Sequence, residues 1–201
     1  MNKIRLILPN NGVILDLQKG EHLYFLGGPI RGANDWQAKA IKMLSKKDPG
    51  CYIVCPCRYN DTHKLYRYHL PATKAKNSTD NVLEFPNQTM WERYYLAMAA
   101  HFGSIVFWIP CEDKNNPRKK EDGPYARDTY GELGRWSVRN ALQMNPQSEY
   151  MSVNLVVGVK KKFPGLSVIQ KNFDADHGKI FPIYPSLEET INQAIQLATQ
   201  E

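Results

Sequence analysis

Short, uninterrupted apolar runs alternate along this chain with segments of helical periodicity. Four runs stand out: His22–Gly28, Cys51–Cys55, Gly103–Pro110 and Ser152–Val159. Apolar residues at consecutive positions over so short a length are typical of strands buried on both faces. Strands that alternate with helices are the pattern of a parallel sheet covered by helices. The sequence therefore predicts an α/β fold with a mainly parallel sheet.

Four helices are expected between and after these strands. Their predicted spans are Asn34 or Asp35 to about Asp48, Asn87 to Ala100, about Thr129 to Met144, and a last helix opened by Ser186 and Glu189 as a capping box. Asp, Asn and Ser at these starts accept hydrogen bonds from the first free backbone N–H groups.

The remaining segments give weaker signals. Lys64 to Leu70 shows a weak alternation of apolar and polar residues and can form an extra strand. Pro71 to Asp80 is polar and is expected to be a loop. Within the first twenty residues, Gly12–Leu15 can add an edge hairpin. The length of 201 residues suits one compact domain over residues 1–201.

The composition is that of a soluble globular protein, with 42% hydrophobic and 23% charged residues. No apolar run approaches the roughly 20 residues of a membrane span, so no membrane partner is expected. The N-terminal residues lack a continuous apolar region with a cleavage site, which favours a cytoplasmic protein.

The net charge of +6 raises the question of an anionic partner. The basic residues form short clusters in expected loops or turns: Lys46–Lys47, Arg118–Lys120 and Lys160–Lys162. Solvated loop charge is the favoured interpretation, and a general attraction for phosphorylated substrates is the functional alternative. No aromatic residues interleave with these clusters, so nucleic-acid binding is the weakest hypothesis.

Four cysteines invite a metal or disulfide hypothesis. Cys55 and Cys57 form a C-x-C, Cys51 precedes them, and Cys111 lies far away, so no second pair completes a zinc site. Cys51, Cys55 and Cys57 share one face of an extended segment, as buried thiols do. We expect reduced core thiols, no metal and no cofactor.

The carboxyl ends of parallel strands form the ligand crevice of such a fold. Three features fall at that edge: Gly27–Gly28 after the first strand, the loop after Pro110, and the start of the helix that contains Glu132. We expect one site there.

Glu132 lies in the sequence Gly131-Glu-Leu-Gly134. In the first turn of a helix, free N–H groups and the helix dipole hold a carboxylate ionised. Flanking glycines leave room for a ligand. Such a carboxylate suits attack on an anomeric carbon. The alternative is structural, because Glu favours first turns without any function.

A second feature is the loop from Tyr24 through Gly27, Gly28 and Arg31 to Asp35 and Trp36. Glycines at a strand end let backbone amides face a ligand, and Asp35 can accept a bond from a sugar hydroxyl. The G-x-G-x-x-G spacing of a dinucleotide site is absent. Trp36 is equally suited to the core and to stacking on a base.

Glu92 follows Trp91 on the second predicted helix. Trp91, Tyr95 and Met98 form a stripe that packs on the sheet, and Glu92 points away from its centre. Glu92 is then either exposed and inert or a second acid in the crevice.

Three groups of motifs occur in order along the chain: Phe-Leu-Gly-Gly-Pro-Ile-Arg-Gly with Asp-Trp-Gln, Trp-Glu before Ile-Val-Phe-Trp-Ile-Pro, and Gly-Glu-Leu-Gly. Together they resemble the nucleoside 2-deoxyribosyltransferase superfamily and its 2-deoxyribosyltransferase-like branch. The likeness covers Leu23 to Val159 in organisation. It implies a flavodoxin-like or Rossmann-like domain with a five-stranded sheet, helices on both faces, and assembly into a homo-oligomer.

The resemblance also implies residue roles. Glu132 would attack C1′ of a 2′-deoxynucleoside and form a deoxyribosyl-enzyme, from which a free base or water takes the sugar. Asp35 would bind the sugar, and Tyr24 and Gly27 would line the same loop. The family places an aspartate before its third strand to protonate the base. This chain has no Asp between Asn81 and Ile109, so that role passes to Glu92.

Three functions stay open. The first is transfer or cleavage of the N-glycosidic bond of deoxynucleosides. The second is an N-glycosidase for nucleoside 5′-monophosphates, with Arg31 and the basic loop Lys114–Lys120 as phosphate contacts. The third is a non-catalytic protein that binds nucleotide derivatives on the same fold.

Overall fold

One sheet of six parallel strands runs through the protein. The computed structural model describes residues 4–9, 12–15, 17–57, 59–72, 84–143 and 153–200. The strand order is β1-β3-β2-β4-β5-β6. The strands are β1 (Arg5–Ile7), β2 (Leu23–Gly27), β3 (Tyr52–Val54), β4 (Gly103–Ile109), β5 (Leu155–Val159) and β6 (Ile183–Tyr184). The predicted α/β class with a parallel sheet is confirmed, with six strands among the described residues where five were expected.

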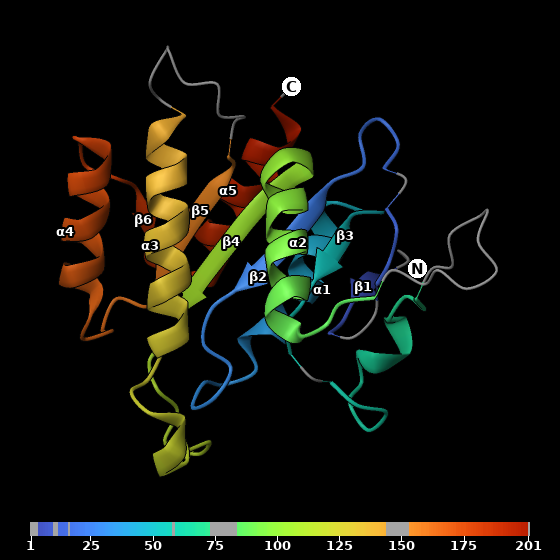
Figure 1. Ribbon diagram of the computed structural model, residues 1–201, viewed down its shortest axis with the longest axis horizontal. Coiled ribbons are helices and arrows are strands. Elements are labelled where there is room, and N and C mark those ends of the chain that lie inside the picture. Colours follow the sequence, from blue (N-terminus) through green and yellow to red (C-terminus); the bar gives the residue numbers. More distant parts are fainter. Residues whose placement is uncertain are drawn as a thin grey trace.

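Helices cover both faces of the sheet (Figure 1). The helices are α1 (Trp36–Lys47), α2 (Gln88–Phe102), α3 (Arg127–Leu142), α4 (Leu166–His177) and α5 (Leu187–Thr199). Figure 1 shows α2 and α3 in front of the sheet, α1 and α5 behind it, and α4 outside α3. Each helix runs antiparallel to the strands, so the N-termini of α2 and α3 lie at the carboxyl edge of the sheet.

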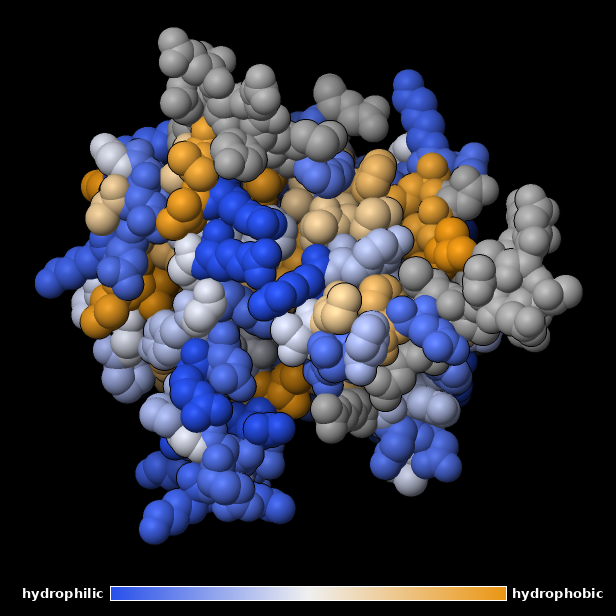
Figure 2. All heavy atoms as spheres, in the orientation of Figure 1, coloured by the Kyte–Doolittle hydropathy of each residue, from blue (hydrophilic) through white to orange (hydrophobic). Residues whose placement is uncertain are grey.

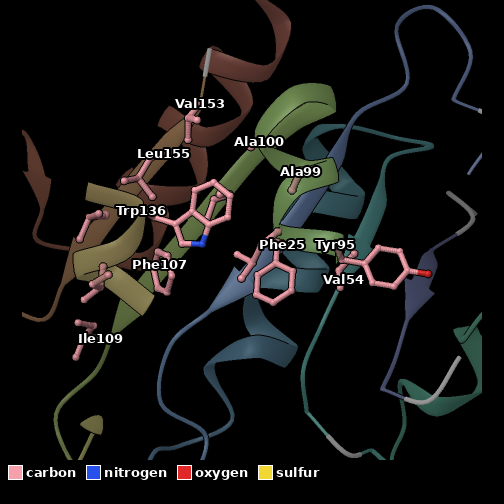
Figure 3. Close-up of a cluster of buried hydrophobic side chains, with 14 of the residues drawn as sticks. Phe25, Val54, Tyr95, Ala99, Ala100, Phe107, Ile109, Trp136, Val153 and Leu155 are labelled. Carbon is pink, nitrogen blue, oxygen red and sulfur yellow. The ribbon is translucent and has the colours of Figure 1, made fainter. Parts of the chain in front are cut away.

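A separate apolar core fills each side of the sheet. The front core joins Phe25 and Phe107 of the sheet to Trp91 and Tyr95 of α2 and Trp136 of α3. Figure 3 shows the Trp136 indole between α3 and α2, near Phe107. The back core contains the alternate residues of the same strands, with α1 and α5: Tyr24, Leu26, Trp36, Val106 and Trp108. The two-residue period of the strands divides the continuous apolar runs between these cores.

The order of the strands sets the position of the crevice. From β2 the chain moves outward to β3, and it then returns to form β4 on the other side of β2. This reversal between β2 and β4 is a topological switch point, and the carboxyl ends of strands at such a point are where α/β folds bind ligands.

The N-terminal segment differs from the expected hairpin. Arg5–Ile7 pairs in parallel with β3 as an edge strand, and Gly12–Leu15 is not part of a strand. Val13 instead exchanges hydrogen bonds with the Tyr95 hydroxyl, which accepts from the Val13 N–H at 2.7 Å and donates to its carbonyl at 3.0 Å. Long-range packing on α2 therefore replaces local strand pairing.

The strand expected at Lys64 to Leu70 is wrong. Tyr66–Tyr68 forms a turn of 3-10 helix, and His69 makes an isolated parallel bridge to Leu6. The Tyr66 and His69 rings stack at 4.4 Å, which favours the compact turn over an extended chain. Of the loop expected at Pro71 to Asp80, residues 71 and 72 have no regular structure, and residues 73–80 lie outside the described residues.

Three of the predicted helix starts are confirmed by their caps. The side chains of Asp35, Asn87 and Ser186 accept from the backbone N–H three residues later. The start of α3 is different, because the helix begins at Arg127, after Ala126 in a left-handed conformation with φ of 60°. It ends at Leu142, and the predicted end at Met144 lies outside the described residues.

The cysteines are placed as expected. Cys51, Cys55 and Cys57 are buried thiols at β3, and Cys111 is half-buried. Lys46 and Lys47 lie in the last turn of α1 and not in a loop. No helix in the described ranges is both long enough and apolar enough to cross a membrane.

Candidate functional site

Glu132 lies in the second turn of α3. The helix begins at Arg127, so Glu132 is its sixth residue and is already inside the intrahelical hydrogen-bond ladder. The free N–H groups and most of the dipole effect are confined to the first turn. Its side chain is partly buried beside α2. The stabilisation expected from a helix N-terminus therefore does not reach this carboxyl group.

The charge state of Glu132 differs from the expected one. Burial raises the pKa of Glu132 to about 7, and the negative charges of Glu92 and Asp128 act in the same direction. The expectation of a carboxylate held fully ionised is wrong, because desolvation and two like charges outweigh the distant helix terminus. Near neutral pH, Glu132 therefore exchanges between its protonated and its ionised form.

Glu92 is the nearest acid across the helix–helix boundary. It lies near the start of α2, is half-buried, and accepts a hydrogen bond of 2.7 Å from the Gln88 side-chain amide to its Oε1. The negative charge of Glu92 contributes to the raised pKa of Glu132 on α3. Of the two alternatives for Glu92, an exposed inert residue does not fit this position. Glu92 and Glu132 lie near enough across the two helices for their charges to interact.

Arginines flank this carboxyl pair. Burial lowers the pKa of Arg135 on α3, and the positive charges of Arg139 of α3 and Arg93 of α2 act in the same direction. Within the described ranges no carboxylate lies within ion-pair distance of any of the three. Figure 2 shows the corresponding deep blue patch between α3 and α2. We refer to Glu92, Arg93, Glu132 and Arg135 as the α2–α3 surface.

Gly131 and Gly134 leave open space on α3. Both are exposed, and a Cβ added at either position would meet nothing within 4 Å. The face of α3 that carries these two glycines is therefore free of packed side chains, with Gly131 about 100° around the helix from Glu132.

Gly27 and Gly28 have a different role. A Cβ at Gly27 would lie 2.5 Å from the Phe107 ring, and one at Gly28 would lie 2.3 Å from the Trp108 carbonyl oxygen. Gly28 also has φ of 142°, which side chains rarely allow. Packing against β4 thus accounts for these glycines without a ligand.

Tyr24 and Trp36 are core residues on the opposite side of the sheet from Glu132. The Tyr24 hydroxyl donates to Asp48 Oδ2 at 2.7 Å, at the amino edge of the sheet. The Trp36 indole donates to the Pro29 carbonyl at 3.0 Å and is 1% exposed. Of the two interpretations of Trp36, core packing is the one that the structure favours.

Asp35 is engaged by neighbours that the sequence did not suggest. Its Oδ1 accepts from the Ala38 N–H at 3.1 Å and from the Tyr59 hydroxyl at 2.6 Å, and its Oδ2 lies 3.1 Å from His63 Nε2. The Tyr59 and His63 rings stack at 3.7 Å. A sugar hydroxyl would have to compete with these contacts. Arg31 is exposed and pairs with Asp122 at 3.1 Å.

A cavity of about 410 Å³ opens at the carboxyl edge, on the side of α1 and α5. Its lining includes Trp36, Lys39, Trp108, Cys111, Lys160 and Ser186, and does not include Glu132 or Glu92. The single site expected at this edge is therefore divided between the two sides of the sheet. The loop residues line the cavity on the α1 and α5 side of the sheet, whereas Glu92 and Glu132 lie on the α2 and α3 side.

No family model matches the chain, and none of the curated proteins matches it.

Proposed function

We propose that this protein cleaves or transfers the N-glycosidic bond of 2′-deoxynucleosides, with Glu132 and Glu92 as its catalytic residues. The observation that carries the proposal is the electrostatic interaction of two carboxyl groups, Glu92 and Glu132, at the carboxyl edge of the sheet, one of them with a pKa raised to about 7. Retaining glycosyl chemistry needs one ionised and one protonated carboxyl group, and two interacting carboxyl groups that share one proton can supply both.

The proposed reaction has two steps. Ionised Glu132 attacks C1′, a C–O bond to the sugar forms, and the C1′–N bond breaks as Glu92 delivers a proton to the departing base. A free base or water, deprotonated by Glu92, then attacks C1′ and releases Glu132. The open space at Gly131 supports the approach of a sugar to Glu132. The reactive form is the one in which Glu132 is ionised and the proton of the pair is on Glu92.

Base release tests the proposal. We would incubate the protein with 2′-deoxynucleosides, with and without an added free base, and separate the products by chromatography. Glu132→Gln should lose at least about 1,000-fold in rate, because the nucleophile is gone. Glu188→Gln, on the exposed start of α5, is the matched control and should be unchanged.

The same assay separates the alternatives. A new nucleoside that appears only with added base indicates a transferase, and base release without it indicates a hydrolase. A ligand that raises the melting temperature while no base is ever released would contradict the enzymatic proposal and favour a binding protein.

The arginines favour one second candidate, an N-glycosidase for deoxynucleoside 5′-monophosphates. Arg93 and Arg135 flank the carboxyl pair without a carboxylate partner in the described part of the chain, and arginine binds phosphate well. Arg135→Gln should then raise KM for a monophosphate about tenfold and leave KM for the nucleoside unchanged. Equal KM changes for both substrates would rule out a phosphate contact.

A further inference from the structure

The cavity at the carboxyl edge lies on the opposite side of the sheet from the carboxyl pair. Its volume of about 410 Å³ is within the range of pockets that hold small molecules. Its walls come from the start of α1, the chain after β4, the residue after β5 and the start of α5. Figure 1 shows α1 and α5 behind the sheet and α2 and α3 in front of it. The sheet therefore separates this cavity from Glu92 and Glu132.

Two lysines from distant parts of the chain line the cavity. Lys39 lies near the start of α1, and Lys160 directly follows β5. In the described part of the chain, neither ammonium group lies within ion-pair distance of a carboxylate. Two cations in one concave space attract an anion, because their fields add there and the walls exclude part of the screening water.

The two acids that line the cavity already have partners. Glu112 Oε1 accepts a hydrogen bond of 2.6 Å from Arg118 Nε, and Asp113 Oδ1 accepts one of 2.9 Å from the Asn115 N–H. Arg118 compensates the charge of Glu112. The two lysines therefore leave the cavity with an excess of positive charge.

The rest of the wall is apolar and rigid. Trp36 and Trp108 are buried, and the Trp36 indole is fixed by its hydrogen bond to the Pro29 carbonyl. Pro185 and Leu187 add apolar surface where α5 begins. An apolar wall beside two ammonium groups fits an anion that carries an apolar portion, because both parts of such a ligand find a complementary surface.

We propose that this cavity binds a small organic phosphate. The phosphate group lies between Lys39 and Lys160, and the organic portion lies against the wall of Trp36 and Trp108. A phosphate ester carries up to two negative charges and several acceptor oxygens, so it can satisfy both ammonium groups at once. This site does not depend on the proposed glycosidic activity, since no residue of the α2–α3 surface lines the cavity.

Isothermal titration calorimetry with phenyl phosphate tests the class of ligand. Phenyl phosphate has no glycosidic bond, so its binding is measured without turnover. We expect saturable binding at least about tenfold tighter than that of inorganic phosphate or of phenol, because burial of the ring and pairing of the charge both contribute. No binding at millimolar phenyl phosphate, or equally tight binding of inorganic phosphate or phenol, would overturn the proposal.

Charge variants test the position of the phosphate. Lys39→Gln and Lys160→Gln should each weaken binding of phenyl phosphate about tenfold, because each removes one charge-assisted contact. Both lysines are exposed, so the circular dichroism spectrum should not change. Lys171→Gln, at an exposed position of α4 that does not line the cavity, is the matched control and should leave binding unchanged. An equal effect of Lys171→Gln would overturn the assignment.

Arg135→Gln distinguishes the cavity from the α2–α3 surface. Arg135 lies on the other side of the sheet, so this variant should bind phenyl phosphate as the wild type does. Weaker binding in Arg135→Gln, with none of the change in the two lysine variants, would place the phosphate at the α2–α3 surface and would overturn the proposal.

Cys111 reports directly on the occupancy of the cavity. It lines the cavity and is half-buried, whereas the other three cysteines are buried. Iodoacetamide should therefore alkylate Cys111 first, and saturating phenyl phosphate should slow this reaction several-fold in the wild type but not in K39Q/K160Q. An unchanged rate with phenyl phosphate would overturn the assignment. Base release is measured in none of these experiments, so failure of this proposal is distinguishable from failure of the proposed function.

Discussion

Two glycine pairs lie in unlike surroundings in this protein. Gly27 and Gly28 end β2 against the Phe107 ring and the Trp108 carbonyl, where no side-chain atom fits. Gly131 and Gly134 lie on the outer face of α3, where a side chain would meet nothing. The first pair is explained by packing, and the second leaves space beside a carboxyl group. A short glycine motif therefore indicates a site only when the space around it is known.

The largest effect should come from the packed pair. Gly28→Ala introduces a Cβ 2.3 Å from a backbone oxygen, at a φ of 142°. Neither the strand nor the carbonyl group can move without a large cost in free energy. We therefore expect the free energy of unfolding to fall by about 3 kcal/mol or more. Urea denaturation measures this value. A loss below about 1 kcal/mol would show that the β2–β4 packing is looser than described.

The carboxyl pair should make stability depend on pH. The folded pKa of Glu132, about 7, lies above its ordinary value of 4.5. A raised pKa means that the protonated side chain stabilises the fold. This contribution is fully present below pH 4.5 and is lost as the pH rises through 7. The free energy of unfolding of Glu132→Gln, relative to that of the wild type, should therefore rise by about 2 kcal/mol from pH 5 to pH 8.

Denaturation of both proteins at the two pH values measures this difference. Glu188→Gln serves again as the control, because its parent side chain is 69% exposed. A constant difference between wild type and Glu132→Gln across this range would mean that Glu132 titrates normally.

Asp35 should behave as a structural residue. Asp35→Ala removes the N-cap of α1 and the acceptor for Tyr59, and should cost about 1 kcal/mol of stability. Asp35→Asn keeps an acceptor and should cost less. If Asp35→Asn instead left stability unchanged and raised KM for a nucleoside tenfold, Asp35 would bind sugar as the resemblance implies.

The open pair should show the smallest effect and the opposite sign. Gly134→Ala places a better helix former on an exposed face with free space, and should raise the free energy of unfolding by about 0.5–1 kcal/mol. A melting curve measures it. Destabilisation here would mean that the face is covered in the isolated molecule.

Much of the fold could be predicted because its signals are local. The apolar runs that became β2, β4 and β5 need no knowledge of distant residues, and neither do the caps at Asp35 and Ser186. The missed elements, β1, β6 and α4, are short or weakly marked. β1 and β6 are edge strands of three and two residues, and α4 buries only Ile169 and Phe173 and lacks a side-chain cap.

The site was harder to predict for a physical reason. A helix start only two residues earlier than expected moved Glu132 from the first turn of α3 to the second. That shift replaced stabilisation of its charge by desolvation and repulsion from Glu92. The meeting of Glu92 with Glu132 depends on how α2 and α3 pack on the sheet, which no local pattern encodes. Tyr59 and His63 were missed because their contacts with Asp35 cross more than twenty residues.

The most direct test of the account is the site of the proposed sugar adduct. The protein is mixed with a 2′-deoxynucleoside, quenched in acid, digested with trypsin and examined by mass spectrometry. Trypsin releases Asp128–Arg135, which contains Glu132, separately from the peptide that ends at Arg93 and contains Glu92. We predict a deoxyribosyl mass on Glu132, absent in Glu132→Gln. An adduct on Glu92 or elsewhere, or undiminished base release by Glu132→Gln, would contradict the account.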